Sequence, residues 1–319
     1  MSSFTFTNQD CYVLEQGNKN LLKFPAVRGH YLPIGPVSGR LKQVEVKPYY
    51  GEFLVICIFE TDEDCSSLPD GASCGIDLGV DNTAALVSSN GRCVLYKGGA
   101  LKSANQWYNK QMADCRSLAM KGHTADEAAK LGLLHTKKMQ SLSRRRNQFF
   151  HDTMHKIASD IVHFCLASGI TTIVIGKNKN WKQKSNIGHV NNQNFVQIPL
   201  ETLRWMITYK AESAGLIVVK QEESYTSKAS LVDGDEIPVY GKETEKPVSF
   251  SGRRIKRGLY RTGSGRIINA DLNGAGNILR KYIPDIFIDR KDFTFLDQIL
   301  VRNYPDLNKR IPVKGIEAV

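Results

Sequence analysis

Hydrophobic and polar positions alternate over short distances through the first part of the chain. Apolar runs at 41–48 and 53–59 stand between turn residues, a pattern typical of short β-strands. The stretch 66–72, which contains Pro, Asp and Gly, has the composition of a linker. The pattern therefore predicts a small β-rich N-terminal region at residues 1–70, followed by a second domain.

Three further apolar runs follow in quick succession, at 74–78, 83–88 and 92–96. A Ser-Asn-Gly turn at 89–91 joins the last two as a β-hairpin. The simplest arrangement of these runs is an antiparallel meander of three strands.

The pattern becomes helical from about 103 to 168, where apolar residues recur at spacings of three and four, and Gly169 stands where a C-cap is expected. The run at 171–175 is continuous and β-branched, which suits a buried parallel strand. A second helix is predicted at 199–214, with proline near its start and glycine just past its end, and a strand follows at 216–219.

The last predicted helix covers 271–281, and the polar, basic segment at 227–268 before it is predicted to be an irregular insertion. Three strands followed by alternating helices and strands predict an α/β protein with an RNase H-like fold, in which helices flank a mixed sheet. This domain is expected at 71–282 with a helical insertion at 100–150, and residues 283–319 are expected to form a C-terminal tail.

Composition narrows the class of protein. The net charge of +11 and the pI near 9.2 indicate a polyanionic partner, most commonly nucleic acid. The seven cysteines form no C-x-x-C pair and no disulfide framework, so we expect reduced thiols. No apolar stretch approaches the roughly 18 residues of a membrane span, and the polar N-terminus does not resemble a signal peptide. We therefore expect a cytoplasmic protein without a membrane partner.

Acidic residues lie at the ends of elements that such a sheet would bring together: Asp77 on the first strand, Glu222 or Glu223 at the end of the fifth, and Asp271 at the start of the last helix. A carboxylate among apolar neighbours is costly unless a cation or hydrogen bonds offset it. Carboxylate oxygens suit Mg²⁺, and two such ions can activate a water for phosphodiester cleavage. Each acid also has a structural interpretation, since turn amides could satisfy Asp77, Asp271 could be an N-cap, and the glutamates could be solvated.

Three ordered motifs make a resemblance specific: GIDLGVDN at 75–82, YTSK at 225–228 and NADLNGAGNI at 269–278. Together they resemble the RuvC-like nuclease region of TnpB proteins, which are transposon-encoded relatives of type V CRISPR effectors and of Fanzor proteins. The similarity covers roughly residues 25–282. It implies an RNA-guided DNA endonuclease, often labelled a transposase, with guide RNA and target DNA as partners. It also implies two Mg²⁺ ions, for which Mn²⁺ could substitute, and water as the nucleophile.

The second metal-binding acid departs from the usual TnpB pattern. Most members carry it on the strand where this chain has Gly176. A subset, with the Fanzor relatives, places it on the neighbouring strand, two residues ahead of the aromatic residue of Y-T-S-K, which is Glu223 here. Because side chains alternate faces along a strand, only one of Glu222 and Glu223 can face the metals, and we favour Glu223. The resemblance thus implies Asp77, Glu223 and Asp271 as catalytic metal ligands.

A zinc ribbon, which TnpB proteins commonly carry between the last two motifs, needs four thiolate or imidazole ligands. This chain has Ala229 where a cysteine is usual, no Cys beyond position 165 and no His beyond position 189, so we expect no zinc there. Two basic clusters could instead bind nucleic-acid phosphates, or be solvated surface. Their members are Arg253, Arg254, Lys256, Arg257 and Arg261 in this segment, and Lys137, Lys138, Arg144, Arg145 and Arg146 in the helical region.

Smaller features complete the expectations. Asn273, Asn277 and Asp81 are candidate groups around the metal ligands, and a polar loop at 181–194 could touch nucleic acid or form a lid. Only 76 residues precede Asp77, fewer than TnpB proteins usually carry, so the resemblance implies a reduced target-reading portion.

Other functions share part of this pattern. An ATPase of the actin and sugar-kinase class also has G-I-D-L-G at its first strand, but it needs a second phosphate loop and a larger C-terminal portion. A nuclease-inactive, RNA-guided DNA-binding regulator is consistent with the glycine at position 176. A guide-independent, structure-selective nuclease would share the metal site without carrying RNA.

Overall fold

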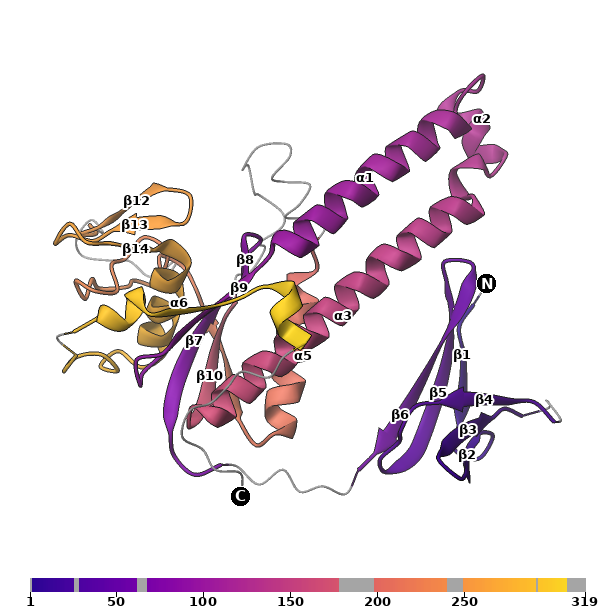
Figure 1. Cartoon of the computed structure of the whole chain (residues 1–319), viewed down its shortest axis with the longest axis horizontal. Helices are drawn as coiled ribbons and strands as arrows, with labels where there is room; N and C mark the ends of the chain where they lie inside the picture. Colours follow the sequence, from indigo (N-terminus) through magenta and orange to yellow (C-terminus); the bar gives the residue numbers. More distant parts are fainter. Residues whose placement is uncertain are drawn as a thin grey trace. The chain divides into compact units, whose positions relative to one another are not determined.

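The computed structural model describes residues 2–25, 29–61, 68–177, 198–239, 249–290 and 292–308. The chain divides into two compact units, which can be followed by residue number in Figure 1. Unit 1 comprises Met1–Asp64 and Tyr108–Gln148, and unit 2 comprises Cys65–Trp107 and Phe149–Val319. The helical insertion expected at 100–150 is thus shared between the units, and the polar loop at 181–194 lies outside the described residues.

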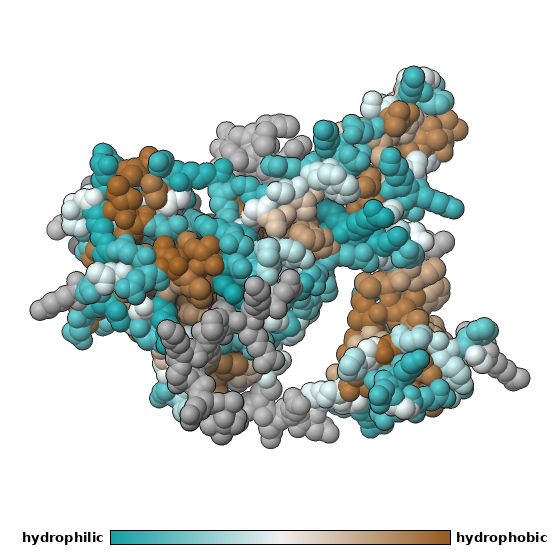
Figure 2. Space-filling view, viewed as in Figure 1, coloured by the Kyte–Doolittle hydropathy of each residue, from teal (hydrophilic) through white to brown (hydrophobic). Residues whose placement is uncertain are grey.

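Two small antiparallel sheets form the N-terminal part of unit 1, which confirms the predicted β-rich region. They contain β1 (Phe4–Thr7), β5 (Arg40–Tyr49) and β6 (Glu52–Glu60), and β2 (Tyr12–Gln16), β3 (Lys19–Lys23) and β4 (Tyr31–Ile34). Leu22, Leu41 and Val44 belong to their buried core. Figure 2 shows that hydrophobic residues also lie on the surface of this part, where Phe53 and Leu54 of β6 are exposed.

Two long helices run side by side in the helical region (Figure 1). The elements are α1 (Gly99–Ala119), α2 (Ala125–Lys130), the 3₁₀ turn η1 (Leu133–His135) and α3 (Lys137–Ala167). Thr124 is the N-cap of the short helix α2, where it forms a capping box with Glu127 and so satisfies two N-terminal amides. Gly169, just past α3, has a φ of 65°, the left-handed conformation predicted for it as a C-cap.

A six-stranded mixed sheet forms the centre of unit 2. Its order is β11 (Ile217–Glu222), β10 (Ile170–Lys177), β7 (Ala72–Asp77), β8 (Asn82–Ser88), β9 (Cys93–Lys97) and β15 (Ile299–Arg302). β7, β8 and β9 form the predicted antiparallel meander, and β10 lies parallel to both β7 and β11. This order and these directions confirm the RNase H-like fold expected from the sequence.

Both faces of this sheet are covered, because alternate side chains of its strands enter two separate cores. Leu86 packs with α3 and α5 (Leu200–Ser213) on one face. Ala85 and Val87 pack with α6 (Ala270–Tyr282) on the other. The contact of α6 with β7 is close, since a Cβ atom at Gly75 would overlap the carbonyl oxygen of Ala275. This contact brings the start of α6 next to the end of β7.

The structure corrects two expectations about the C-terminal third. The segment 227–268, expected to be irregular, contains strands of a small antiparallel sheet: β12 (Arg253–Lys256), β13 (Leu259–Arg261) and β14 (Ile267–Asn269). The expected tail, 283–319, supplies β15, which pairs with β9, and the 3₁₀ turns η2 (Thr294–Asp297) and η3 (Tyr304–Asn308). These strands have only three or four residues, and several of those residues are arginine, so their periodicity is too short to detect.

Candidate active site

Asp77 is the last residue of β7, at the edge of the sheet where α6 begins. Burial raises the pKa of Asp77 well above its ordinary value, and the charges of Glu223 and then Asp271 raise it further. Arg254 and Arg204 lower the pKa, but by less. The Asp77 carboxyl therefore lies near two other acids, with too little positive charge around it to offset them.

Glu223 directly follows β11 and faces this group of acids, whereas Glu222 does not. Glu222 accepts hydrogen bonds from the Lys281 ammonium at 2.5 Å and from the Ser224 amide at 2.6 Å. Burial alone would raise the pKa of Glu222, but these hydrogen bonds outweigh it and lower the pKa. The alternation of side chains along β11 thus separates the two glutamates as expected, and places Glu223 rather than Glu222 beside Asp77.

The turn after Glu223 has an uncommon conformation. Tyr225 has a φ of 65°, which is rare for a residue with a side chain. Thr226 donates both its amide and its hydroxyl to the Glu223 carbonyl, at 3.3 and 2.8 Å. Asn277 of α6 donates to the carbonyl oxygens of Thr226 and Ala229, and Asn273 also donates to Ala229. Asn273 and Asn277, expected near the metal ligands, hold this loop against α6.

Two glycines make room for the acids. A Cβ atom at Gly176 would overlap Oε2 of Glu223, so the Glu223 carboxylate occupies the space in which a side chain from β10 would begin. A Cβ atom at Gly274 in α6 would lie only 2.8 Å from Oδ2 of Asp77. Arg204, which is buried on α5, donates to the Gly176 carbonyl at 3.1 Å and fixes the end of β10. The glycine where most TnpB proteins carry an acid is therefore where Glu223 fits.

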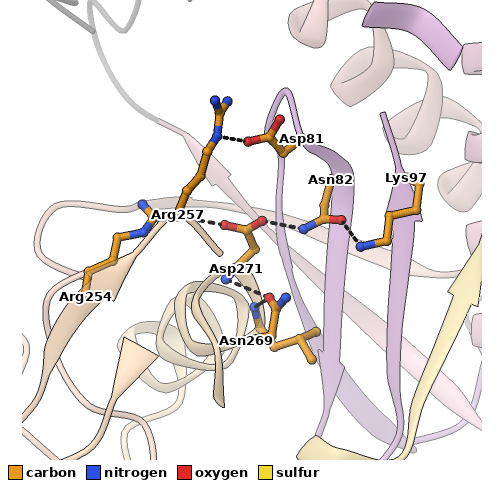
Figure 3. A network of polar contacts seen from close by, with 8 residues as sticks. Asp81, Asn82, Lys97, Arg254, Arg257, Asn269 and Asp271 are labelled. Atoms are coloured by element: carbon orange, nitrogen blue, oxygen red, sulfur yellow. Dashed lines mark hydrogen bonds and ion pairs between the residues drawn. The ribbon is translucent and has the colours of Figure 1, made fainter. Parts of the chain in front are cut away.

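Asp271 lies in the first turn of α6, but it is not the N-cap. Asn269 is the cap, since its side-chain oxygen accepts the amides of Asp271 and Leu272 at 2.9 and 3.1 Å. The Asp271 carboxylate instead contacts Asn82, whose amide nitrogen donates to Oδ2 at 2.6 Å, and Arg254, which lies 3.4 Å from Oδ1 (Figure 3). The structural interpretation of Asp271 as a cap is therefore wrong. Its carboxylate is instead one of the acidic groups that surround Asp77.

The donor set has the chemistry that Mg²⁺ prefers, because Asp77, Glu223 and Asp271 supply only carboxylate oxygens. A divalent cation would also offset the excess negative charge that raises the pKa of Asp77. Within the described residues, no three His, Cys, Asp or Glu side chains lie close enough together to hold a metal ion as they stand. Binding by the three acids would therefore require them to draw closer than they lie here.

Basic residues of the small sheet reach the same edge of the main sheet. Arg257 pairs with Asp81, and Lys97 donates to Asn82 at 3.0 Å (Figure 3). The other carboxylate oxygen of Asp81 accepts from Lys102 at 2.5 Å. Asp81 thus forms ion pairs with two basic side chains beside the acids. Of the predicted basic cluster, Arg254 and Arg257 lie beside the acids. Arg253, Lys256 and Arg261 lie on β12 and β13, with Arg253 opposite Arg261.

Asp233 joins the two sides of the segment in which TnpB proteins commonly carry zinc. Its carboxylate accepts hydrogen bonds from the hydroxyls of Ser230 and Ser251, the latter at 3.1 Å, and from the amides of Gly263 and Ser264 at 2.6 and 3.2 Å. One carboxylate therefore links stretches of chain some 30 residues apart.

The second basic cluster lies in unit 1, on the first half of α3. Within that unit Arg144 pairs with Glu52 at 2.5 Å, and the Arg146 guanidinium lies 5.5 Å from the ring centre of Tyr108. Lys137, Lys138 and Arg145 belong to the same stretch of helix. The two predicted basic clusters thus belong to different units.

Several residues of the site were not found from the sequence. Lys97, Lys102 and Arg204 carried no motif, and Asn82 stood inside the first motif without an assigned role. A buried arginine in the apolar face of α5 was the available signal for Arg204, since such a group needs partners.

Among the described residues, no helix is long and apolar enough to cross a membrane.

Comparisons with known proteins give family-level similarities. The family model OrfB_IS605, described as a probable transposase, matches residues 57–182, and the Cas12f1-like TNB domain matches residues 201–278. The TnpB-like protein ORF457 of Acidianus two-tailed virus is 26% identical over 245 residues, which is 76% of this chain. The chain spans 47% of the length of that relative.

Solved structures show a partial similarity of the backbone. A cryo-EM structure of the Cas12f1–sgRNA–target DNA complex matches with a TM-score of 0.44 and 17% sequence identity. The matched part covers 87% of this chain and 66% of the chain in that structure. The mini-RNA-guided endonuclease CRISPR-Cas_phi3 has a TM-score of 0.43 and 12% identity, and covers 76% and 51%. The two family models match the regions that carry the three motifs, and together with the TnpB-like viral relative they support a TnpB-family protein.

Proposed function

We propose that this protein is an RNA-guided DNA endonuclease that hydrolyses phosphodiesters with two Mg²⁺ ions held by Asp77, Glu223 and Asp271. The observation that carries the proposal is the position of these acids at the end of β7, just after β11 and in the first turn of α6, where two of them raise the pKa of the third. A purely structural role would not need three like charges at one edge of a sheet.

The chain's own residues have defined tasks in this reaction. A bound pair of Mg²⁺ ions would activate a water and stabilise the leaving oxygen, so no protein nucleophile is needed. Gly176 and Gly274 leave space for the Glu223 and Asp77 carboxylates. Arg254, beside Asp271, and Arg257, on the turn between β12 and β13, would bind phosphates that reach this edge.

Guide RNA and target DNA are the partners that fit the charge of the protein. Base pairing between the two nucleic acids would supply sequence specificity, and the basic residues of β12, β13 and α3 would bind backbones. Affinity for nucleic acid should therefore fall steeply as salt is raised.

The test begins with RNA that co-purifies with the protein. This RNA is sequenced, a matching double-stranded DNA is prepared, and cleavage is measured with Mg²⁺, with Mn²⁺ and with a chelator. We expect guided cleavage that requires the metal and is lost in Asp77→Asn, Glu223→Gln and Asp271→Asn. Glu222→Gln is the matched control, because Glu222 is paired with Lys281, and it should retain cleavage.

The main alternative is a nuclease-inactive, RNA-guided regulator, which would result if Glu223 did not take the place of the acid absent at position 176. It predicts guided DNA binding without cleavage under any metal condition. Cleavage of branched DNA without RNA would instead indicate a guide-independent nuclease. Loss of activity in Glu222→Gln but not in Glu223→Gln would refute the assigned ligand.

A further inference from the structure

Asn82 and Lys97 form a short chain of hydrogen bonds that ends on Asp271. The Lys97 ammonium donates to the Asn82 side-chain oxygen at 3.0 Å, and the Asn82 side-chain nitrogen donates to Oδ2 of Asp271 at 2.6 Å (Figure 3). Asn82 is 6% exposed, so its amide cannot rely on water for partners.

A β-bulge creates this alignment. Along the hairpin of β8 and β9, Ala84 lies opposite Tyr96, and regular pairing would next place Thr83 opposite Lys97. The register shifts there instead, so that Asn82 lies opposite Lys97. The amide of Gly98 donates to the Asp81 carbonyl at 2.8 Å, which ties the two strand ends together beside the bulge. The bulge therefore turns the Asn82 side chain toward α6.

The chemistry of the three groups permits one orientation of the amide. An ammonium is only a donor and an ionised carboxylate is only an acceptor. The Asn82 oxygen must then face Lys97, and its nitrogen must face Asp271. Reversal of the amide would place an oxygen against the carboxylate and an NH₂ group against the ammonium. Lys97 thereby sets which end of Asn82 meets Asp271.

The hydrogen bond from Asn82 acts on one of the two oxygens of the Asp271 carboxylate. Asn269 already satisfies the first amides of α6, so the Asp271 side chain has no capping task. Asn82 holds Oδ2, whereas Oδ1 has a longer contact of 3.4 Å with Arg254. Asn82 therefore fixes the position of one oxygen, while the other keeps the longer contact with Arg254.

We propose that Asn82 is a positioning residue that orients the Asp271 carboxylate for metal binding, and that Lys97 acts through it by setting the direction of its amide. This inference rests on the proposed function of the site. Groups that orient metal ligands typically change metal affinity by about 10- to 100-fold when they are removed.

The test measures Mn²⁺ binding by calorimetry on the protein with its co-purified RNA, alongside melting temperature and guided DNA binding. Asn82→Ala should weaken Mn²⁺ binding by about 10-fold or more, with DNA binding unchanged. Lys97→Arg keeps a donor facing the amide oxygen and should retain wild-type affinity. Lys102→Met removes a cation that contacts Asp81 rather than Asn82, and it should not weaken Mn²⁺ binding.

Lys97→Glu separates orientation from simple charge. An added negative charge near a metal site should tighten Mn²⁺ binding by attraction alone. If Lys97 sets the amide, the new carboxylate instead draws the Asn82 nitrogen away from Asp271, and Mn²⁺ binding weakens. Mn²⁺ affinity equal to or above wild type in Lys97→Glu would overturn the proposal, as would an Asn82→Ala variant that loses only melting temperature.

Wild type and Asp271→Asn distinguish the two levels of the argument. If wild type binds no Mn²⁺, or Asp271→Asn binds it equally well, the proposed metal site itself fails. If Asp271→Asn loses binding while Asn82→Ala keeps wild-type affinity, only the positioning role fails.

Discussion

Replacement of Gly176 by alanine tests whether the space on β10 seats the Glu223 carboxylate. The added methyl would fall inside van der Waals contact with Oε2 of Glu223 and lie 2.7 Å from Cδ1 of Ile278. Ordinary carbon–oxygen contacts are about 3.3–3.6 Å, so the carboxylate must retreat by about 1 Å. A displacement of that size in a catalytic group can cost about 100-fold in rate.

Stability should also fall, by an amount that leaves the protein folded. The Glu223 carboxylate is the far end of a flexible side chain and can move, whereas Ile278 is buried and must adjust within the core. Overpacking of this kind costs about 1–3 kcal/mol, which shows as a lower melting temperature of a protein that remains folded.

The assay is single-turnover cleavage of a guide-matched DNA at saturating Mg²⁺, with guided DNA binding measured in parallel. Gly176→Ala should slow cleavage by about 100-fold and leave binding unchanged. Gly99→Ala is the matched control, because no heavy atom would lie within 4 Å of its Cβ. The reasoning is refuted if Gly176→Ala cuts at the wild-type rate while Glu223→Gln does not cut.

Three further predictions concern stability and nucleic-acid binding. Arg302→Met removes the two hydrogen bonds of 2.6 and 2.9 Å that Arg302 donates to the buried Asp160 carboxylate. The free energy of unfolding, measured by denaturant titration, should therefore fall by about 3–5 kcal/mol. Recovery of this free energy in an Asp160→Leu/Arg302→Met double variant would confirm the cause. Burial alone would raise the pKa of Asp233, but hydrogen bonds from the residues it links lower it. Its stabilising effect is therefore present above its ordinary pKa near 4 and lost as pH falls through the lowered value, so Asp233→Asn should lower the melting temperature at pH 7 but not at pH 2, and equal effects at both would contradict this. Arg257→Ala removes a cation whose side chain is 61% exposed, and it should reduce the salt slope of guided DNA binding by about 1. Arg266→Ala should not, because the Arg266 side chain is 29% exposed and binds both the Phe293 carbonyl and Asp297.

The sequence predicted five of the six strands of the main sheet, β7 to β11, because these strands are apolar runs bounded by clear turn or helix signals. It also separated Glu223 from Glu222, since alternation along a strand is a local property. The role of Asn82 could not be found in this way, because a bulge shifts it by one position from the partner that regular pairing predicts. Cap assignment failed at Asp271 because Asn269, two residues earlier, is an equally good cap.

The strands β12 to β15 were not predicted, for a related reason. Each has three or four residues. β15 pairs with the distant β9 and carries the Asp160–Arg302 ion pair, and β12, β13 and β14 pair with one another next to the segments that Asp233 links. Such contacts depend on the tertiary structure and leave no period in the sequence.

The overlap between Glu223 and any side chain at position 176 has a consequence for the family. The two positions compete for one volume, so a relative should carry an acid at one of them and a small residue at the other. The residues at positions 176 and 223 should therefore vary together among relatives. A sequence survey that requires an acid at one fixed position would class relatives with the acid at the other position as inactive. A survey that considers both positions together would keep them among the candidate nucleases.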